Sequence, residues 1–479
     1  MLLKNSAIYM LAKAVPALAA FIALSFYTHL LSPEEYGLYT LIFTAAVFAH
    51  NTVFNWICMG TMRFWASSRY SDDAFISSIT IAYFKVLLII IVPLLISLFI
   101  YWDSDVRTWI FGGFLLTLTL ALFTIVQILL SAKIQPLKYA LLTISTAIST
   151  LSLGALLAYL GYGAIGIIAG MSVGFFIPSL FMSLTTWKKF DKKSYDKALF
   201  KRLLVYGLPL ASAALLEEFT KSADRFMLAA MLDKSQAGLY AVGYDISGNS
   251  VFMLMTAISL AAYPIIIKLL ENDGKQAAYE YFEKYTVLLL GIAIPAVLGL
   301  ILVGSNLVSL VIGVEYQATT LLLLPWITVA LLLLGLQVFY FDFAFQLGDH
   351  AIGIVKIGAV IAITNLFLNY WLIPIMGIQG AAIATISSFA LGSFLSFVLG
   401  RKYFRVPFPM MDFIKILLAT FVMGLSLWWF KDLIGWGWLL VQLLIGIVSY
   451  FVMIIALNVM DMRAQLLQRL LSEKGVCKV

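Results

Sequence analysis

The stretch LSPEEYGLY at residues 31–39 returns as LDKSQAGLY at residues 232–240, with the first leucine and the final Gly-Leu-Tyr in register. Pro93 and Pro295 lie at nearly the same separation, and two similar glycine-rich segments begin at Gly163 and Gly377. These repeated motifs predict two copies of one folding unit within the chain. If each copy crosses a membrane an even number of times, both have the same orientation, which is the parallel repeat found in some secondary transporters.

The composition supports a membrane protein. The chain has 479 residues, of which 63% are hydrophobic and only 11% are charged. A soluble domain carries about 25% charged residues, so this chain has too few to cover a water-exposed surface. The composition excludes a cytosolic enzyme, a nucleic-acid-binding protein and a secreted disulfide-rich protein, and the two cysteines and three histidines show no metal-ligand spacing.

The hydrophobic runs predict an all-α polytopic fold, because a spanning helix needs about 20 apolar residues. Two six-helix bundles and a final helix pair account for about fourteen transmembrane helices. They are expected near residues 7–31, 36–60, 77–101, 107–131, 139–160, 164–187, 203–230, 236–266, 285–304, 319–346, 352–373, 377–400, 413–430 and 438–459.

The same runs divide the chain into four parts. We expect an N-terminal six-helix bundle at 1–187 and a basic cytoplasmic connector at 188–202. A second six-helix bundle follows at 203–400, and a peripheral helix pair with a cytoplasmic tail occupies 401–479.

The basic residues predict the orientation. With both termini in the cytoplasm, 23 of the 31 Lys and Arg residues fall on the inner side. The external loops contain only Arg107, Lys234 and Lys431. Cytoplasmic loops carry an excess of Lys and Arg, so this asymmetry predicts that both termini of a multi-pass protein lie in the cytoplasm.

Three motifs resemble a known family. The turn SPEEYGLY at 32–39, the segment ADRFML at 223–228 and the run NYWLIP at 369–374, which leads into GIQGAAIAT at 377–385, are similar to the polysaccharide-transporter branch (Wzx-like) of the MOP (MATE-like) exporter superfamily. The resemblance covers nearly the whole chain. It implies an inner-membrane flippase for a polyprenyl-diphosphate-linked oligosaccharide, in contact with membrane lipids and other polysaccharide assembly proteins.

The seventh predicted span carries the main candidate site, which consists of Glu217, Glu218, Lys221, Asp224 and Arg225. At 100° per residue these side chains fall within one 120° wedge of the helix. Each ionisable group in lipid costs roughly 2.5–3.5 kcal/mol, so the wedge must face a watery cavity or other helices. The two cations are candidates for binding a diphosphate, and the carboxylates for coupling to an ion. The alternative is a self-neutralising network that only stabilises the bundle.

Other polar residues lie within predicted spans. Lys13 is a candidate for contact with the substrate in the cavity. Asp245, Asn249 and His50 are candidates for ion coupling or for a hydrogen-bonding network in the cavity. Asp342, near the inner end of the tenth span, is expected to be a gate or interface group.

The predicted function is outward translocation of the lipid-linked oligosaccharide by alternating access, driven by an ion gradient or the membrane potential. No cofactor or metal is expected other than H⁺ or Na⁺ as the coupling ion, and the chain has no GxxxxGK[ST] motif for ATP. The alternatives are a peptidoglycan-precursor flippase or multidrug exporter of the same superfamily. A membrane polysaccharide polymerase or ligase is disfavoured, because no external loop is long enough to carry catalytic groups.

Overall fold

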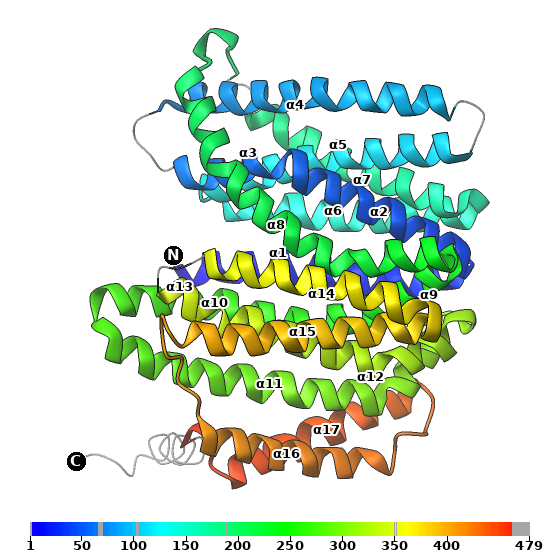
Figure 1. Ribbon diagram of the computed structural model, residues 1–479, viewed down its shortest axis with the longest axis vertical. Helices are drawn as coiled ribbons and strands as arrows, with labels where there is room; N and C mark the ends of the chain where they lie inside the picture. Colours follow the sequence, from blue (N-terminus) through cyan, green and yellow to red (C-terminus); the bar gives the residue numbers. More distant parts are fainter. Residues whose placement is uncertain are drawn as a thin grey trace. The chain divides into compact units, whose positions relative to one another are not determined.

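A computed structural model describes residues 2–65, 70–101, 105–186, 190–348, 350 and 352–461, and within these ranges the regular structure is helical throughout (Figure 1). Short π-helical turns occur at Ala158–Tyr162, Gly248–Phe252 and Gln337–Phe341. The α-helices are α1 (Leu2–Leu30), α2 (Pro33–Val53), α3 (Asn55–Phe64), α4 (Asp72–Ile100), α5 (Asp105–Ala132), α6 (Pro136–Leu157), α7 (Gly163–Thr186), α8 (Lys197–Met231), α9 (Lys234–Ser247), α10 (Met253–Asn272), α11 (Gly274–Val311), α12 (Val314–Leu336), α13 (Phe343–Leu347), α14 (Ile352–Met376), α15 (Ile378–Gly400), α16 (Met410–Trp428) and α17 (Trp436–Ala456).

Eleven helical stretches of the described chain are long and apolar enough to cross a membrane, or twelve if α2 and α3, bent by 48°, form one span. The multi-span helical fold is therefore confirmed. The predicted number of fourteen spans differs from this count in two places. It divides the apolar run Pro136–Leu184, within which the chain reverses, into the two helices α6 and α7, and it includes α8, which carries the charged wedge.

The run Pro136–Leu184 contains a reversal of the chain at Gly161 and Gly163, which have φ angles of +88° and +55°. Beyond this reversal, Gly170 packs on the backbone of Gly154, and Gly174 packs on Thr150. As the residue numbers rise along α7, the numbers of the residues they contact fall along α6, so the two helices are antiparallel. A glycine between α14 and α15 has nearly the same backbone conformation: Gly163 has φ 55°, ψ −142° and Gly377 has φ 59°, ψ −136°. This likeness supports the predicted repeat.

The chain forms two compact units, Met1–Ala241 and Val242–Val479. The first unit includes α8, because α8 packs closely on α3: Gly60 contacts Leu203, and Gly207 lies against the backbone of Trp56. The packing units therefore divide the chain later than the predicted connector at 188–202. Three residues of that connector, Lys192–Ser194, form a short 3-10 turn.

The repeated Gly-Leu-Tyr motifs meet inside the first unit. Ser32 caps α2 by accepting a hydrogen bond from the Glu35 amide at 3.3 Å, and Pro33 begins the helix. Gly37 then lies directly against the backbone of Lys234, and Gly238 against the backbone of Pro33. A side chain on either glycine would collide with main-chain atoms, so α2 and α9 can cross this closely only through glycine.

The second unit packs α11 against α12, α10 and the antiparallel pair α16 and α17 (Figure 1). A neutral polar cluster fixes the turn between α16 and α17. The Asn306 amide nitrogen donates to Gln442 Oε1 at 2.9 Å and to the Gly435 carbonyl at 3.3 Å. The Gly435 amide donates to Asn306 Oδ1 at 2.8 Å, and Gln442 donates to the Phe430 carbonyl at 2.6 Å. We call Asn306, Gly435 and Gln442 the α11–α17 clamp.

Candidate functional site

The charged wedge lies on α8, and the structure shows how that helix begins. Asp196 caps it by accepting hydrogen bonds from the amides of Ala198 and Leu199 at 2.7 and 2.9 Å. Pro209 lies inside the helix. A proline inside a helix removes one backbone hydrogen bond and favours bending.

Asp224 points into the protein. Its side chain is 1% exposed, and its Oδ2 accepts a hydrogen bond at 2.7 Å from the hydroxyl of the fully buried Tyr240. Tyr240 is the last residue of the repeated Gly-Leu-Tyr motif, so this bond links α8 to α9 next to the glycine crossing. The contact favours the stabilising role that the sequence left open for Asp224.

Arg225, the next residue, is half-buried and faces α2. Its Nη1 donates to the Thr44 hydroxyl at 3.5 Å, and Thr44 is buried in α2. The guanidinium is therefore held among helices of the first unit. In the sequence, Thr44 is notable only as a hydroxyl residue in an apolar helix. Such residues often form hydrogen bonds between helices in membranes.

The remaining wedge residues are less fully described. The side chains of Glu217 and Lys221 lie outside the described part of the structure. Glu218 is half-buried, and its carbonyl accepts a hydrogen bond from the Ser222 hydroxyl at 2.6 Å. The joint role of Lys221 and Arg225 toward a diphosphate stays a prediction.

His50 is buried where α2 ends and the chain bends into α3. Its Nε2 lies 2.8 Å from the Thr124 hydroxyl on α5, its Nδ1 lies 3.3 Å from Asn51 Oδ1, and its ring stacks on Phe54. These contacts join α2 to α5 at the 48° bend. Among the partners, only Asn51 is next to the histidine in sequence, and Thr124 could not be identified from spacing.

Lys13 is exposed on α1, one turn before Pro16, and its contact with substrate stays a prediction. Lys85, on α4, shows how a cation can be held at a helix surface. Its ammonium lies 3.2 Å from the Tyr195 hydroxyl and 4.4 Å from the centre of the Phe200 ring. Both partners follow the 3-10 turn of the connector, so Lys85 ties α4 to the start of α8.

Asp245 and Asn249 are half-buried in the second unit, at the junction of α9 and the π-helical turn Gly248–Phe252. The π turn inserts a residue into the helix, so Asp245 and Asn249, which are four residues apart, are not separated by one regular α-helical turn. Such turns occur frequently at functional sites. Next to this turn, the hydroxyls of Ser247 and Thr328 lie 3.0 Å apart and link α9 to α12.

Asp342 follows the π-helical turn Gln337–Phe341. It is 2% exposed, and its Oδ1 accepts a hydrogen bond from the Ser396 hydroxyl of α15 at 2.7 Å. This contact joins the broken α12–α13 helix to α15, which agrees with the interface role expected from the sequence.

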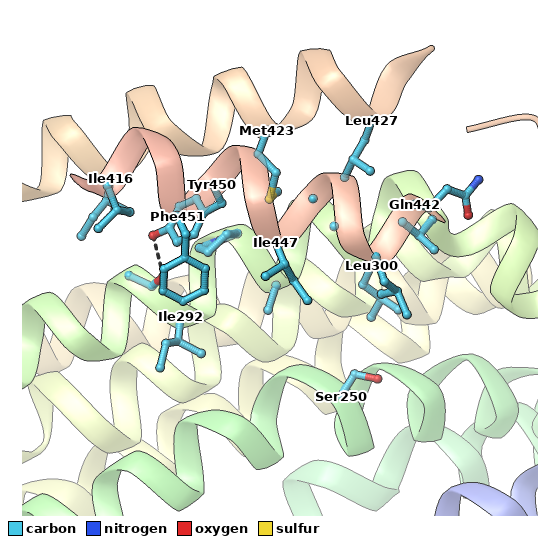
Figure 2. A pocket seen from close by; sticks show the side chains of 18 of the residues that line it. Ser250, Ile292, Leu300, Ile416, Met423, Leu427, Gln442, Ile447, Tyr450 and Phe451 are labelled. Atoms are coloured by element: carbon cyan, nitrogen blue, oxygen red, sulfur yellow. Dashed lines mark hydrogen bonds between the residues drawn. The ribbon is translucent and has the colours of Figure 1, made fainter. Parts of the chain in front are cut away.

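A groove between α11, α16 and α17 was not predicted (Figure 2). It has a volume of about 550 Å³ and is almost wholly apolar, with Ile292, Leu300, Met423 and Ile447 among its lining residues. The Tyr450 hydroxyl within it donates to the Gly291 carbonyl at 2.6 Å. We call this the α17 groove. Sequence periodicity could not reveal it, because it depends on how three helices pack.

Broken helices and buried polar contacts between the helices of a multi-span protein are features found in membrane transporters. A family model described as polysaccharide biosynthesis protein matches residues 27–320, more than half of the chain, so the chain belongs to that family. The predicted membership of a polysaccharide-related membrane protein family is thereby confirmed.

Similar proteins agree with this family. The Haloferax volcanii protein named "Probable flippase AglR" is 31% identical over 179 residues, and the match covers 36% of each chain. The solved structure of the lipid II flippase MurJ in an inward closed conformation aligns with a TM-score of 0.74 at 16% identity, over 95% of this chain and 99% of MurJ. An inward-facing MATE multidrug transporter aligns with a TM-score of 0.58 at 15% identity, over 82% and 97%. At these identities, the two structures show a common fold.

Proposed function

We propose that the chain is a flippase that carries a polyprenyl-diphosphate-linked oligosaccharide from the cytoplasmic to the outer leaflet of the inner membrane by alternating access. Family membership over residues 27–320 is the observation that carries this proposal. The relative from Haloferax volcanii, which bears the name of a flippase, supports it. The fold shared with MurJ and a MATE transporter fits a moving bundle.

The substrate has an anionic head, and the first unit offers a cation for it. Arg225 is half-buried rather than exposed to lipid, and its guanidinium can bind two phosphate oxygens at once. Lys221 precedes it by four residues in the sequence, which is about one turn of α8. A cationic site favours a diphosphate over a cationic drug, because like charges repel strongly in a low-dielectric site.

The substrate also has a long apolar tail. The α17 groove offers about 550 Å³ of apolar space. If a methylene group takes about the 30 Å³ that a water molecule occupies, the groove holds ~18 carbon atoms, which is part of a polyprenyl chain. No ionisable carboxylate or cation is among the lining residues, so this groove suits the tail and not the head.

Proteoliposomes with a fluorescent polyprenyl-diphosphate oligosaccharide test the proposal. Lys221→Ala combined with Arg225→Ala is expected to abolish translocation while the protein stays folded, and Lys221→Arg is expected to retain part of the activity. Lys356→Ala is the matched control, since Lys356 is an exposed lysine of α14. Translocation at the wild-type rate by the double variant would contradict the proposed role of the cations. No translocation by the wild-type protein would contradict the proposed function itself.

Imposed ion gradients distinguish between the two candidate coupling ions, H⁺ and Na⁺. A proton-driven flippase should respond to an imposed pH gradient in sodium-free proteoliposomes, and a sodium-driven one should respond only to a Na⁺ gradient. Neutral variants of the half-buried Asp245 and Glu218 then show whether either carboxylate takes part in coupling.

A further inference from the structure

A second groove lies wholly within the first unit. It has a volume of about 440 Å³ and runs between α2 and α5, with Ile90 of α4 at its side and Lys234 of α9 at its rim. The groove exists because α2 presents Ala45 and Ala49 there, while α5 presents Gly113. These small residues leave space that larger side chains would fill.

The rim of this groove carries a cation. The Lys234 ammonium lies 4.3 Å from the centre of the Trp109 ring, and both side chains are half-buried lining residues. Within the described chain, no carboxylate forms an ion pair with this ammonium. Asp233, its neighbour, is exposed and instead accepts a hydrogen bond from the Gln236 amide at 2.8 Å.

The position of this cation is unusual for the chain. On the predicted topology, Lys234 is one of only three basic residues in external loops, and Arg107 is another, one residue after the lining residue Val106. Trp109 is of the type that occupies the level of lipid headgroups. An apolar groove with a cation and an indole at one end has the chemistry of a lipid site.

We propose that the groove binds one anionic phospholipid of the outer leaflet, with an acyl chain along α2 and α5 and the phosphate at Lys234. At about 30 Å³ for each methylene group, 440 Å³ holds ~15 carbon atoms, which matches a single acyl chain. The site is independent of the proposed transport function, because it needs neither α8 cation.

Native mass spectrometry of the purified full-length protein tests the site. The probes are phosphatidylglycerol and phosphatidylcholine with the same acyl chains. We expect the wild type to retain phosphatidylglycerol about fivefold better, as a single cation near the membrane surface allows. Lys234→Gln should abolish this preference. Ala45→Leu, at an exposed position in the groove, should reduce retention of both lipids.

Lys431→Gln is the matched control. Lys431 is another half-buried external lysine, with its ammonium 3.4 Å from the centre of the Trp428 ring, and it does not line this groove. It should keep the wild-type preference. An unchanged preference in Lys234→Gln, or an equal loss in both lysine variants, would overturn the proposal. Retention of a polyprenyl phosphate in place of phosphatidylglycerol would also overturn it.

Discussion

Glycine has opposite effects in two regions of this molecule. Where α2 and α9 cross, Gly37 and Gly238 bring two backbones into contact, and no space is left. In the α17 groove (Figure 2), Gly291, Gly299 and Gly446 line a cavity of about 550 Å³. A side chain added at Gly299 would meet no atom within 4 Å.

The contrast shows that the surroundings decide what a glycine does. The crossing is also held by the buried bond between Asp224 and Tyr240, whereas the uncharged α11–α17 clamp contributes Gln442 to the lining of the groove. A transporter needs both tight contacts that hold a conformation and spaces that accept an apolar chain. The following variants test each side of the comparison.

The largest effect is expected at the crossing. Gly238→Val places a branched side chain against the backbone of Pro33 and Gly37. Overpacking a tight contact typically costs about 1–3 kcal/mol and sometimes more, and main-chain atoms cannot move aside as a side chain can. We expect little folded protein, measured as the monodisperse fraction after extraction in detergent.

Gly299→Ala is the control from the other region. It should raise the melting temperature, since alanine favours a helix over glycine by about 1 kcal/mol and no atom obstructs it. Normal folding of Gly238→Val would mean that α2 and α9 do not need their close contact.

The sequence predicted this crossing only in part. The motifs at 31–39 and 232–240 marked two equivalent turns, because turns need particular residues at fixed positions. The same logic identified Gly163 and Gly377, which share a positive φ. The contact between the two Gly-Leu-Tyr motifs depends on tertiary packing, and neither motif contains a local pattern that predicts it.

The second-largest effect on stability is expected at the α11–α17 clamp. Asn306→Ala removes the acceptor of the Gly435 amide and the donor to Gln442 Oε1, and Asn306 and Gln442 are 0% and 1% exposed. Leaving buried polar groups without partners costs about 1–3 kcal/mol each. We expect a loss of about 2–3 kcal/mol, seen as a lower melting temperature in detergent. Asn306→Asp keeps the acceptor, but it places a carboxylate oxygen against Gln442 Oε1 and the Gly435 carbonyl, so it should lower the melting temperature at least as much as Asn306→Ala. A melting temperature unchanged by Asn306→Ala would show that the clamp does not hold the α16–α17 turn.

The candidate site was predicted less completely than the fold. Spacing placed Asp224 and Arg225 on one face of α8, but Asp224 bonds Tyr240 and Arg225 bonds Thr44. The wedge shows which side chains avoid lipid, and it does not show whether they meet water or another helix. The α17 groove had no signal at all, because its lining is composed of ordinary apolar residues from three helices.

The third effect concerns Asp224. Asp224→Ala leaves the fully buried Tyr240 hydroxyl without this acceptor, and we expect a loss of about 1–2 kcal/mol. Tyr240→Phe in the same protein should recover part of that loss, because it removes the buried donor. The double-variant cycle is measured by thermal unfolding. If the two losses simply add, the Asp224–Tyr240 bond does not stabilise the crossing.

The smallest effect on stability, and the sharpest test of the comparison, is expected for Gly299→Leu. The new side chain extends into the α17 groove, where its Cβ meets no atom within 4 Å, so the free energy of unfolding should change by less than about 1 kcal/mol. It occupies space that the proposed polyprenyl tail needs, so translocation of a long-chain substrate in proteoliposomes should fall sharply. A substrate analogue with a short tail should be affected much less, because it does not fill the groove. Equal loss for both substrates would mean that Gly299 serves helix movement, and unchanged transport of both would remove the groove from the transport pathway.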